Sequence, residues 1–475
     1  MKYPAVQNQI AGQPVPFDGA HAEVVSPLDG SLLSRVPLSS GAEIDAAVVA
    51  AKRAFPAWSA RTIKERSQVF YAYRALLERN RQELATLIHE ENGKTLEEGR
   101  AEVAKAMEVT EFACSLPQIA AGEVLEVSPG IDCRVQYVPL GVVASITPFN
   151  FPCMVPHWTV PIAVCLGNCL VLKPSEKVPL TAQRTAMLLA EAGLPPGVFS
   201  VVHGQRAVVE AICDHPDIAA VTVVGSTPIA RQVYLRATSK LKRCLALGGA
   251  KNHLVVLPDA DVAPTAENVM ASVAGCAGQR CMAAATLLAV GNVDPIIDAV
   301  CEQARWLVPG QAIGAVISRE AKMRIEGYIT QAEAAGAKVL VDGRGASVRG
   351  CEGGFYVGPT VIDGVRPDMP IAREEVFGPV LAIIRARDVA EAVAIENGSP
   401  FGNAAAIYTR DGQAARDFAE RASAGMIGVN VGVPVPREPF GFGGWNDSRF
   451  GAGDITGKSS IGFWTQAKKI TTRWS

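Results

Sequence analysis

The segment Gly275–Ala283, with the sequence GCAGQRCMA, contains the residues best suited to covalent chemistry. Cys281 follows a run of small residues and precedes the apolar run Ala283–Val290, so a loop can hold its thiol within reach of a ligand. The thiolate is the nucleophilic form of cysteine, and Arg280 beside it is expected to favour that form. Most cysteines are only small buried hydrophobic residues, and the chain has eleven. Cys281 is therefore a candidate nucleophile that needs further support.

Asn150 is the natural complement to such a nucleophile. Pro148 and Pro152 restrict the backbone on either side of Asn150. A rigidly held side-chain amide can donate a hydrogen bond to the oxyanion that forms when a nucleophile adds to a carbonyl group. The alternative is an asparagine that only stabilises a turn.

Two short turns could bind a nucleotide. Gly225–Thr227 lies between a predicted strand and a predicted helix, and a helix N-terminus offers free N–H groups to a phosphate. Lys173–Glu176 follows a strand at its carboxyl end, where the ligands of parallel sheets bind. An N-cap serine and a solvated turn are the alternatives. Gly457–Ser459 and Gly93–Thr95 lack the earlier glycine of a phosphate loop, so both are interpreted as ordinary turns.

The elements that position these residues follow from the apolar pattern. Residues 40–110 are predicted to be helical, and Ser40 with Glu43 forms a capping-box pattern. After Pro139, helices alternate with short apolar strands, which are expected at 141–146, 168–172, 198–203 and 219–224. This alternation predicts an α/β fold with a doubly wound parallel sheet, and a second α/β region is expected over 248–444.

Three further segments have a distinct character. Residues 149–172 contain no charged side chain, but their prolines and Gly167 favour a buried helix, a turn and a strand over a membrane span. Residues 119–137 alternate like a hairpin, and the β-branched tail 463–475 resembles a strand. A hairpin and a terminal strand outside both lobes suggest an element that joins subunits, so we expect a homo-oligomer, a tetramer or a dimer.

Composition excludes several classes of protein. The 475 residues carry a net charge of −2, which argues against a nucleic-acid or a membrane partner. Six scattered histidines and no Cys-x-x-Cys or His-Glu-x-x-His motif predict that the chain has no metal site. The cysteines show no framework spacing and no signal-like segment begins the chain, so a cytoplasmic location is expected.

Taken together, five segments in this order resemble the aldehyde dehydrogenase superfamily over essentially the whole chain. They are Pro148–Pro152, Lys173–Glu176, Gly225–Thr227, Gly278–Cys281 and Glu374–Pro379. The resemblance implies an aldehyde dehydrogenase-like fold with two doubly wound parallel-sheet domains and a small β oligomerisation element.

The resemblance also implies a division of the chain. Residues 1–118 and 138–246 would form an NAD-binding domain, and residues 247–444 a catalytic domain with the nucleophilic cysteine. Residues 119–137 and 445–475 would form the oligomerisation arm.

Three segments are similar to one branch of the superfamily, the methylmalonate-semialdehyde dehydrogenases. They are Gly249–His253, Gln279–Ala283 and Gly425–Pro434. This resemblance implies an NAD-dependent, CoA-acylating reaction. Its substrate would be malonate or methylmalonate semialdehyde, and its products acetyl-CoA or propionyl-CoA and carbon dioxide.

The resemblance implies a role for each matching residue. Cys281 would be the nucleophile, and Asn150 with the Cys281 N–H would form the oxyanion hole. Glu375 would bind the nicotinamide-side ribose, and Glu176 near the adenosine ribose would favour NAD over NADP. Residues expected to line the NAD site are Thr147, Phe149, Lys173, Glu176, Lys177, Ser226, Gly248, Glu375 and Phe377.

Ala246 bears on how the reaction ends. Acid-forming members of the superfamily carry a glutamate directly before a Leu-Gly-Gly run, which is Leu247–Gly249 here, and Ala246 precedes it. Water needs a base to attack a thioester, whereas a thiol ionises by itself at roughly pH 8.5. Transfer to CoA is therefore favoured. The alternative is an acid-forming, NAD-dependent enzyme acting on another small semialdehyde, in which a different carboxylate serves as the base.

Two basic residues are candidates for binding a substrate carboxylate. The resemblance implies that Arg280 faces this group and that a second arginine stands in a helix after Glu102-Val103, where this chain has Lys105. Lysine keeps the charge but loses the bidentate geometry. The alternative for Lys105 is a solvated helix face.

Overall fold

A sheet of buried apolar strands forms the centre of the first lobe. The computed structural model describes residues 1–474. Strands β7, β8, β10 and β11 are buried on both faces, as is usual for parallel strands covered by helices on both sides. The strand order is β2-β1-β9-β8-β7-β10-β11-β21. The bounds are β1 Asn8–Ile10, β2 Gln13–Val15, β7 Val142–Ile146, β8 Cys169–Lys173, β9 Phe199–Val201, β10 Ile218–Val224, β11 Arg243–Leu247 and β21 Arg449–Phe450.

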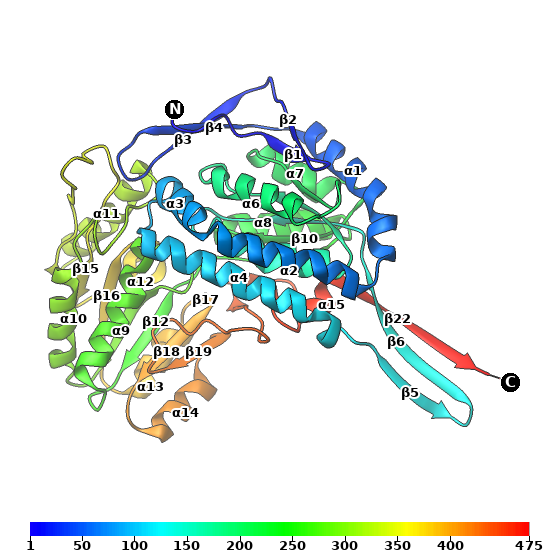
Figure 1. The fold of residues 1–475 in the computed structure, drawn as a ribbon. Coiled ribbons are helices and arrows are strands. Elements are labelled where there is room, and N and C mark those ends of the chain that lie inside the picture. Colours follow the sequence, from blue (N-terminus) through cyan, green and yellow to red (C-terminus); the bar gives the residue numbers. More distant parts are fainter. Residues whose placement is uncertain (475) are drawn as a thin grey trace.

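Helices cover this sheet, and the first of them begins at the cap that the sequence predicts. Ser40 and Glu43 form the predicted capping box of the first helix, and Thr95 with Glu98 forms another at α4. The α2 and α4 helices pack side by side in front of the sheet (Figure 1). The helices of this lobe are α1 Gly41–Ala60, α2 Ile63–Arg79, α3 Arg81–Asn92, α4 Leu96–Ile119, α5 Met154–Cys165, α6 Pro179–Glu191, α7 Arg206–Asp214 and α8 Thr227–Ser239.

The second lobe contains a second parallel sheet with a hydrophobic core of its own. Its order is β14-β15-β16-β13-β12-β18-β19, and only the edge strand β14 is antiparallel. Its strands are β12 Asn252–Val256, β13 Ala284–Val290, β14 Lys338–Val341, β15 Thr360–Asp363, β16 Val380–Ala386, β18 Ala404–Tyr408 and β19 Met426–Val429. Its helices are α9 Val262–Ala274, α10 Asp294–Trp306, α11 Arg319–Ala334, α12 Pro370–Arg373, α13 Val389–Asn397 and α14 Gly412–Arg421. The α/β fold with two parallel-sheet domains is thus confirmed.

A three-stranded antiparallel sheet projects from the body as an arm (Figure 1). It consists of β5 (Glu123–Ser128), β6 (Ile131–Pro139) and β22 (Thr465–Arg473), with β6 in the centre. The tail strand therefore pairs with the hairpin, although the two are more than 300 residues apart in sequence.

The arm is shorter than the predicted range 445–475. The strand β21 pairs with β11 in the first sheet, and β20 (Trp445–Asn446) pairs with β17 (Phe401–Gly402). The side chains of α15 (Ser460–Trp464) are mostly buried against the body. Residues 445–464 thus belong to the body, because β20, β21 and α15 contact it before the chain reaches the arm. The remaining hairpin is β3 (His21–Val25) with β4 (Leu32–Pro37).

The uncharged segment 149–172 forms a helix, a turn and a strand, as predicted. The α5 helix has 12 residues, eleven of them buried, and β8 follows after a turn at Gly167. Within residues 1–474, no helix is both long and apolar enough to cross a membrane.

Candidate active site

A cavity of about 1270 Å³ lies where the first sheet changes direction. From β7 the chain runs outward through β8 and β9 on one side, and β10 and β11 lie on the other side. Ligands of such sheets bind at the carboxyl ends of the strands beside this switch point. Ile146, Lys173 and Val224 end three of these strands, and all three line the cavity.

The second lobe faces the same cavity with the amino ends of its strands, whereas the first lobe faces it with the carboxyl ends. The loops that carry Gly248, Cys281 and Glu375 lead into β12, β13 and β16, which are parallel neighbours. The amino ends of parallel neighbours meet at one edge of a sheet, so the three loops come together there. All three residues line the cavity.

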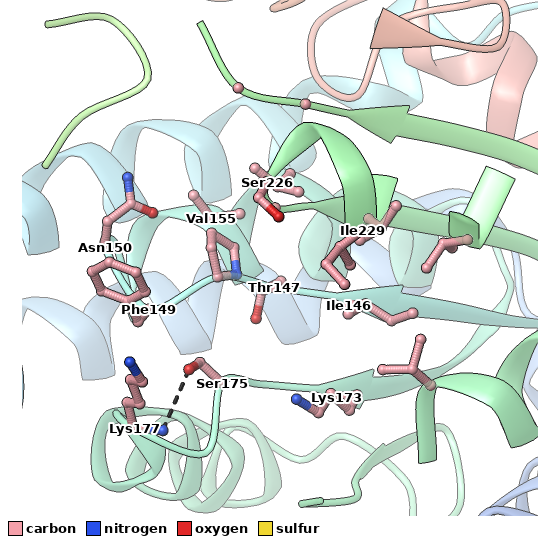
Figure 2. A pocket seen from close by; sticks show the side chains of 18 of the residues that line it. Ile146, Thr147, Phe149, Asn150, Val155, Lys173, Ser175, Lys177, Ser226 and Ile229 are labelled. Carbon is pink, nitrogen blue, oxygen red and sulfur yellow. Dashed lines mark hydrogen bonds between the residues drawn. The ribbon is translucent and has the colours of Figure 1, made fainter. Parts of the chain in front are cut away.

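The structure brings together every residue that was predicted for the nucleophile, the oxyanion hole and the NAD site. Figure 2 shows the first-lobe side of the cavity, with Thr147, Asn150 and Ser226 on neighbouring elements. The predicted residues that line it are Thr147, Phe149, Asn150, Lys173, Glu176, Lys177, Ser226, Gly248, Cys281, Glu375 and Phe377. Arg280 and Lys105 are not among the lining residues.

The turn after β8 holds charged groups at the mouth of the cavity. Lys173 is buried, and its Nζ lies 3.2 Å from Oε2 of Glu176 in an ion pair. The ammonium of Lys177 lies 5.7 Å from the centre of the Phe149 ring, which in turn packs edge-on against Phe377. These groups offer hydrogen bonds and aromatic surface to a ligand with hydroxyl groups and a flat ring.

The N-terminus of α8 is open toward the cavity. Ser226 is the N-cap, but its side chain makes no capping hydrogen bond, so the helix-end N–H groups keep their donor capacity. A Cβ atom on Gly225 would meet nothing closer than 3.9 Å, which leaves room for a ligand. An uncapped helix end of this kind can bind a phosphate. The alternative of a capping serine does not fit this geometry.

Glu375 lies close to the glycine turn after β11. Its Oε1 accepts a hydrogen bond from the Ala250 N–H at 3.0 Å. A Cβ on Gly249 would lie 2.5 Å from Oε2 of Glu375, so the approach requires a residue without a side chain. Burial raises the pKa of Glu375 to about 7, and Lys251 acts in the opposite direction.

The loop that carries Cys281 has a fixed and unusual backbone. Cys276 and Ala277 adopt left-handed conformations, with φ of 54° and 52°. Gly278 follows with φ of +69°, and a Cβ there would lie 2.2 Å from the Gly378 backbone. Only glycine fits this position, and the contact holds the nucleophile loop against the Glu375 loop.

Amide side chains fix the backbone on both sides of the nucleophile. Asn150 Nδ2 donates to the Gln279 carbonyl at 3.0 Å. The Cys281 carbonyl accepts from Asn252 Nδ2 at 2.7 Å and from Asn403 Nδ2 at 2.9 Å. An amide nitrogen has two N–H groups, so Asn150 keeps one donor for an oxyanion beside Cys281.

A buried ion pair supports Asn150 from behind. Lys94 Nζ donates to the Asn150 carbonyl at 2.6 Å and pairs with Glu102, and both ionic side chains are almost completely buried. The other oxygen of Glu102 accepts from the N–H groups of Cys153 and Met154 at 2.8 and 3.0 Å. This network anchors the turn from Asn150 into α5.

The surroundings of Cys281 favour its thiol over its thiolate form. Burial and the charge of Glu375 raise the pKa of Cys281 to about 12. Arg280 lowers this pKa, but less than burial and Glu375 raise it. Arg280 thus favours the thiolate, as expected, although burial and Glu375 outweigh its effect.

No acid stands at position 246. Ala246 lies in the middle of the buried strand β11 and is not exposed at all. Among the described residues, the carboxylates that line the cavity are Glu176, Glu210, Glu320 and Glu375. Of these, Glu375 has the largest effect on the pKa of Cys281.

The two basic residues predicted for the substrate carboxylate already have protein partners. Arg280 Nη2 donates to the carbonyls of Ala271 and Ser272 at 2.5 and 2.8 Å. Lys105 forms ion pairs with Glu108 and Glu438. Lys105 is thus neither a solvated side chain nor a free cation.

Sequence reasoning missed the groups that hold the site in place. Asn252 and Asn403 fix the Cys281 carbonyl, and Lys94 with Glu102 supports Asn150. Asn252 belongs to Gly249–His253, a segment whose family resemblance gives the asparagine no separate role. Lys94 belongs to Gly93–Thr95, which the sequence indicates is an ordinary turn. A buried polar residue beside a predicted loop is the signal that could have drawn attention to them.

Comparisons with known proteins identify the family. Residues 15–470 match the aldehyde dehydrogenase family. Malonate-semialdehyde dehydrogenase 1 of Geobacillus kaustophilus is 43% identical, over 99% of this chain and 98% of that protein. Malonate-semialdehyde dehydrogenase of Pseudomonas aeruginosa is 42% identical, over 98% of this chain and 95% of that protein.

Two crystal structures share the fold. One, from Sinorhizobium meliloti, is described as a methylmalonate-semialdehyde dehydrogenase complexed with NAD; it has a TM-score of 0.98, 42% identity and coverage of 100% of this chain and 99% of its own. Methylmalonate-semialdehyde dehydrogenase of Oceanimonas doudoroffii has a TM-score of 0.98 and 40% identity at the same coverage. The family match and both full-length relatives lead to the same conclusion: the chain belongs to the aldehyde dehydrogenase family.

Proposed function

We propose that the chain catalyses the NAD-dependent, CoA-acylating oxidation of malonate or methylmalonate semialdehyde. The products would be acetyl-CoA or propionyl-CoA, with loss of carbon dioxide. The observation that carries this proposal is one cavity that joins Cys281, Asn150 and Glu375, in a chain whose buried residue 246 is an alanine and not an acid. The malonate- and methylmalonate-semialdehyde dehydrogenases among its relatives support the choice of substrate.

The residues of the cavity fit NAD. The open N-terminus of α8 would bind the phosphates, and Lys173 with Glu176 would bind the adenosine ribose. Glu375 would bind the second ribose, and the similar chain from S. meliloti forms a complex with NAD. When bound, NAD supplies the acceptor for the hydride that leaves the aldehyde.

The steps assigned to this chain begin at Cys281. The Cys281 thiol gives up its proton to solvent, and the thiolate adds to the aldehyde carbon, so a carbon–sulfur bond forms and the carbonyl oxygen becomes an oxyanion. The free N–H of Asn150 and the N–H of Cys281 stabilise this oxyanion. After the carbon has lost its hydride, a thioester remains on Cys281.

The second half of the reaction releases the acyl group. A carboxylate β to the thioester carbonyl leaves as carbon dioxide, and the carbanion takes up a proton. The CoA thiolate then attacks the thioester carbon, forms acyl-CoA and returns Cys281 as a thiolate. CoA ionises without help from the protein, whereas water would need a base, and Ala246 provides none.

A substrate panel tests the proposal. Propanal and the semialdehydes of malonate, methylmalonate and succinate are each incubated with NAD, with and without CoA. NADH absorbance and mass detection of acyl-CoA are the readouts. Acetyl-CoA from malonate semialdehyde, formed only with CoA, supports the proposal. Malonate semialdehyde turnover that yields no acyl-CoA would contradict it.

The second candidate is an acid-forming aldehyde dehydrogenase. The observation in its favour is Glu375, a buried carboxylate with a pKa of about 7 whose charge acts on Cys281. Such a group could deprotonate water. If Glu375 is the base, turnover without CoA is substantial in the wild type and is lost in Glu375→Gln, while turnover with CoA persists.

The arm and the thiols support two further parts of the proposal. We propose that the arm joins subunits into a dimer or a tetramer, because the apolar side chains of its edge strand β5 are exposed.

We also propose a cytoplasmic location, since all eleven cysteines are free thiols, as in a reducing compartment.

A further inference from the structure

Lys251 is a buried lysine whose ammonium group has no hydrogen-bond partner. Its side chain is 3% exposed, and its Nζ donates to no group within residues 1–474. A buried ammonium in this state is unfavourable, because it has lost its hydration and gained no hydrogen bond in return. The buried Lys94, by contrast, has both a carbonyl and a carboxylate partner. Lys251 therefore stands out as a buried cation that the packing of the fold does not explain.

Lys251 directly follows the turn that contacts Glu375. The Ala250 N–H donates to Oε1 of Glu375 at 3.0 Å, and a Cβ on Gly249 would lie 2.5 Å from Oε2. Because neighbouring Cα atoms are about 3.8 Å apart, the Lys251 Cα lies less than about 9 Å from Oε1. The flexible four-carbon stem of lysine can span much of this distance, so the ammonium group is within electrostatic reach of the carboxylate.

The charges of Lys251 and Glu375 act on each other. Burial lowers the pKa of Lys251 to about 8, whereas Glu375 and, less strongly, Glu374 raise it. Burial raises the pKa of Glu375 to about 7. The Ala250 N–H, Lys251 and Arg324 oppose this rise, in decreasing order. Each of the two groups thus favours the charged form of the other.

The other charged or titratable groups around this pair differ from it in their response to pH. They are Glu374, Arg324, His253 and Cys281. His253 is neutral, because burial and the charge of Lys251 lower its pKa to about 3. The guanidinium of Arg324 stays charged and donates to the Val376 carbonyl at 2.6 Å. Among the groups whose pKa is shifted here, Lys251 and Glu375 are the two that change charge near neutral pH.

We propose that Lys251 is a positioning residue that provides the counter-charge of Glu375 and keeps this carboxylate ready for the ribose hydroxyl groups of NAD. The inference rests on the proposed function, because it assumes that Glu375 binds this ribose. Lys251 is not among the residues that line the cavity, so it acts on the cofactor through Glu375. Without Lys251, the carboxylate would take up its proton at higher pH and lose part of its capacity to accept hydrogen bonds.

The test is Lys251→Met in the full-length enzyme, with the Kd for NAD measured by calorimetric titration between about pH 6 and pH 9. The pH at which NAD binding weakens is expected to move up by about one pH unit, because an opposite charge beside Glu375 is lost. At about pH 7.5 the Kd should then be about threefold higher than in the wild type. At about pH 9 the two Kd values should be equal, since Glu375 is ionised in both proteins and Lys251 is neutral in the wild type.

Two outcomes of this titration would overturn the proposal. One is an unchanged pH profile, and the other is a Kd that rises by the same factor at every pH, as a packing defect would cause. Lys338→Met is the matched control, because it removes an exposed lysine of the edge strand β14 in the same lobe. Its pH profile should coincide with that of the wild type.

A double variant tests whether Lys251 acts through Glu375. In the Glu375→Gln background, Lys251→Met should leave the Kd for NAD unchanged at every pH, because the carboxylate on which the ammonium acts is gone. A rise in Kd of the same size in both backgrounds would contradict the pairing of the two residues.

Urea unfolding at about pH 9 separates this role from a structural one. The Lys251 amine is neutral there and has no hydrogen-bond partner, so Lys251→Met should unfold at the same urea concentration as the wild type or at a higher one. A clearly lower midpoint would assign Lys251 to the support of the fold and overturn the proposal.

Glu375→Gln alone keeps this inference distinguishable from the proposed function. If Glu375→Gln leaves the Kd for NAD and its pH profile unchanged, the ribose contact in the proposed function is wrong. If Glu375→Gln flattens the profile but Lys251→Met does not shift it, the inference about Lys251 is wrong and the ribose contact stands.

Discussion

Cys281 combines a partly buried thiol with the neighbouring charges of Arg280 and Glu375. Because burial and Glu375 together outweigh Arg280, the pKa of Cys281 is raised to about 12. A nucleophile in this state must lose its proton when substrate and cofactor are in place, which limits unwanted oxidation of the free enzyme.

Replacing the nucleophile should separate chemistry from binding. Cys281→Ala is expected to abolish NADH formation and to leave the Kd for NAD within about twofold, because the sulfur forms the covalent bond but no cofactor contact. NADH absorbance and a calorimetric NAD titration measure the two effects. Cys276→Ala, which removes a buried thiol from the same loop, is the control and should keep turnover. Retained turnover in Cys281→Ala would remove the nucleophile assignment.

NAD affinity should depend on pH through Glu375. Its pKa is raised from the usual value of 4.5 to about 7, so the carboxylate is ionised above pH 7 and neutral below. Only the ionised form accepts two ribose hydroxyl hydrogen bonds, so the Kd for NAD should rise as the pH falls from 8 to 6. Intrinsic fluorescence titration measures this Kd, and Glu375→Gln should give a flat profile. An equally steep profile in that variant would assign the dependence to another group.

Arg280 should discriminate between aldehydes by their charge. Arg280→Leu is expected to raise the KM for malonate semialdehyde about tenfold or more and to affect propanal much less, because only the former presents a carboxylate to the guanidinium. Steady-state kinetics with both aldehydes measure the ratio of the two changes in KM. Arg305→Leu, at an exposed arginine of α10, is the control. If the KM rises equally for both aldehydes, Arg280 acts instead by holding the loop through its hydrogen bonds to Ala271 and Ser272.

At the scale of elements, the buried Lys94–Glu102 ion pair connects α4 with the turn before α5, because both of its residues hydrogen-bond the backbone of that turn. Lys94 and Glu102 hold the Asn150 carbonyl and the following N–H groups, so the oxyanion donor depends on a network at its back. A donor fixed before the reaction stabilises a developing charge without reorganisation.

Breaking that pair should cost both stability and rate. Lys94→Met leaves Glu102 buried and uncompensated, so the free energy of unfolding should fall by about 3–5 kcal/mol, and kcat should fall because Asn150 loosens. Urea unfolding and NADH kinetics are the measurements. Lys52→Met breaks the exposed pair with Asp217 and should cost less than about 1 kcal/mol. Equal costs for the two variants would contradict the role assigned to Lys94.

The sequence predicts elements well where the signal is local. Apolar runs placed β7, β8 and β10 within one or two residues, and the Ser40–Glu43 capping box starts α1 as expected. The residues predicted for the cofactor meet in one cavity because most lie at or after the end of a strand of the first sheet, while Glu375 and Phe377 precede β16 of the second sheet. Sequence does not reveal partners that are distant in the chain, so neither the Lys105–Glu438 pair nor the return of β21 to the first sheet was foreseen.

At the scale of the whole molecule, two sheets face each other across the cavity and the arm extends away from both (Figure 1). The first lobe contributes the carboxyl edge of its sheet and the second lobe the amino edge of its own. The nucleophile and the oxyanion donor thus come from different lobes, so the site depends on how the lobes pack.

The arm should govern assembly. Val124 and Leu125 of the edge strand β5 are 73% and 67% exposed, which is costly unless another subunit covers them. Leu125→Lys is expected to shift the mass in sedimentation velocity toward that of a single chain. Leu241→Lys, at a leucine that is 96% exposed outside the arm, should leave the mass unchanged. A Leu125→Lys variant with wild-type mass would place the interface elsewhere.

The most direct test of a Cys281 thioester that CoA resolves is rapid mixing of enzyme, NAD and malonate semialdehyde without CoA. NADH should appear in a burst of about one equivalent per active site and then nearly stop, because the acyl group stays on Cys281. Adding CoA should restore steady turnover and produce acetyl-CoA. Steady NADH formation without CoA, at the rate seen with it, would contradict the account.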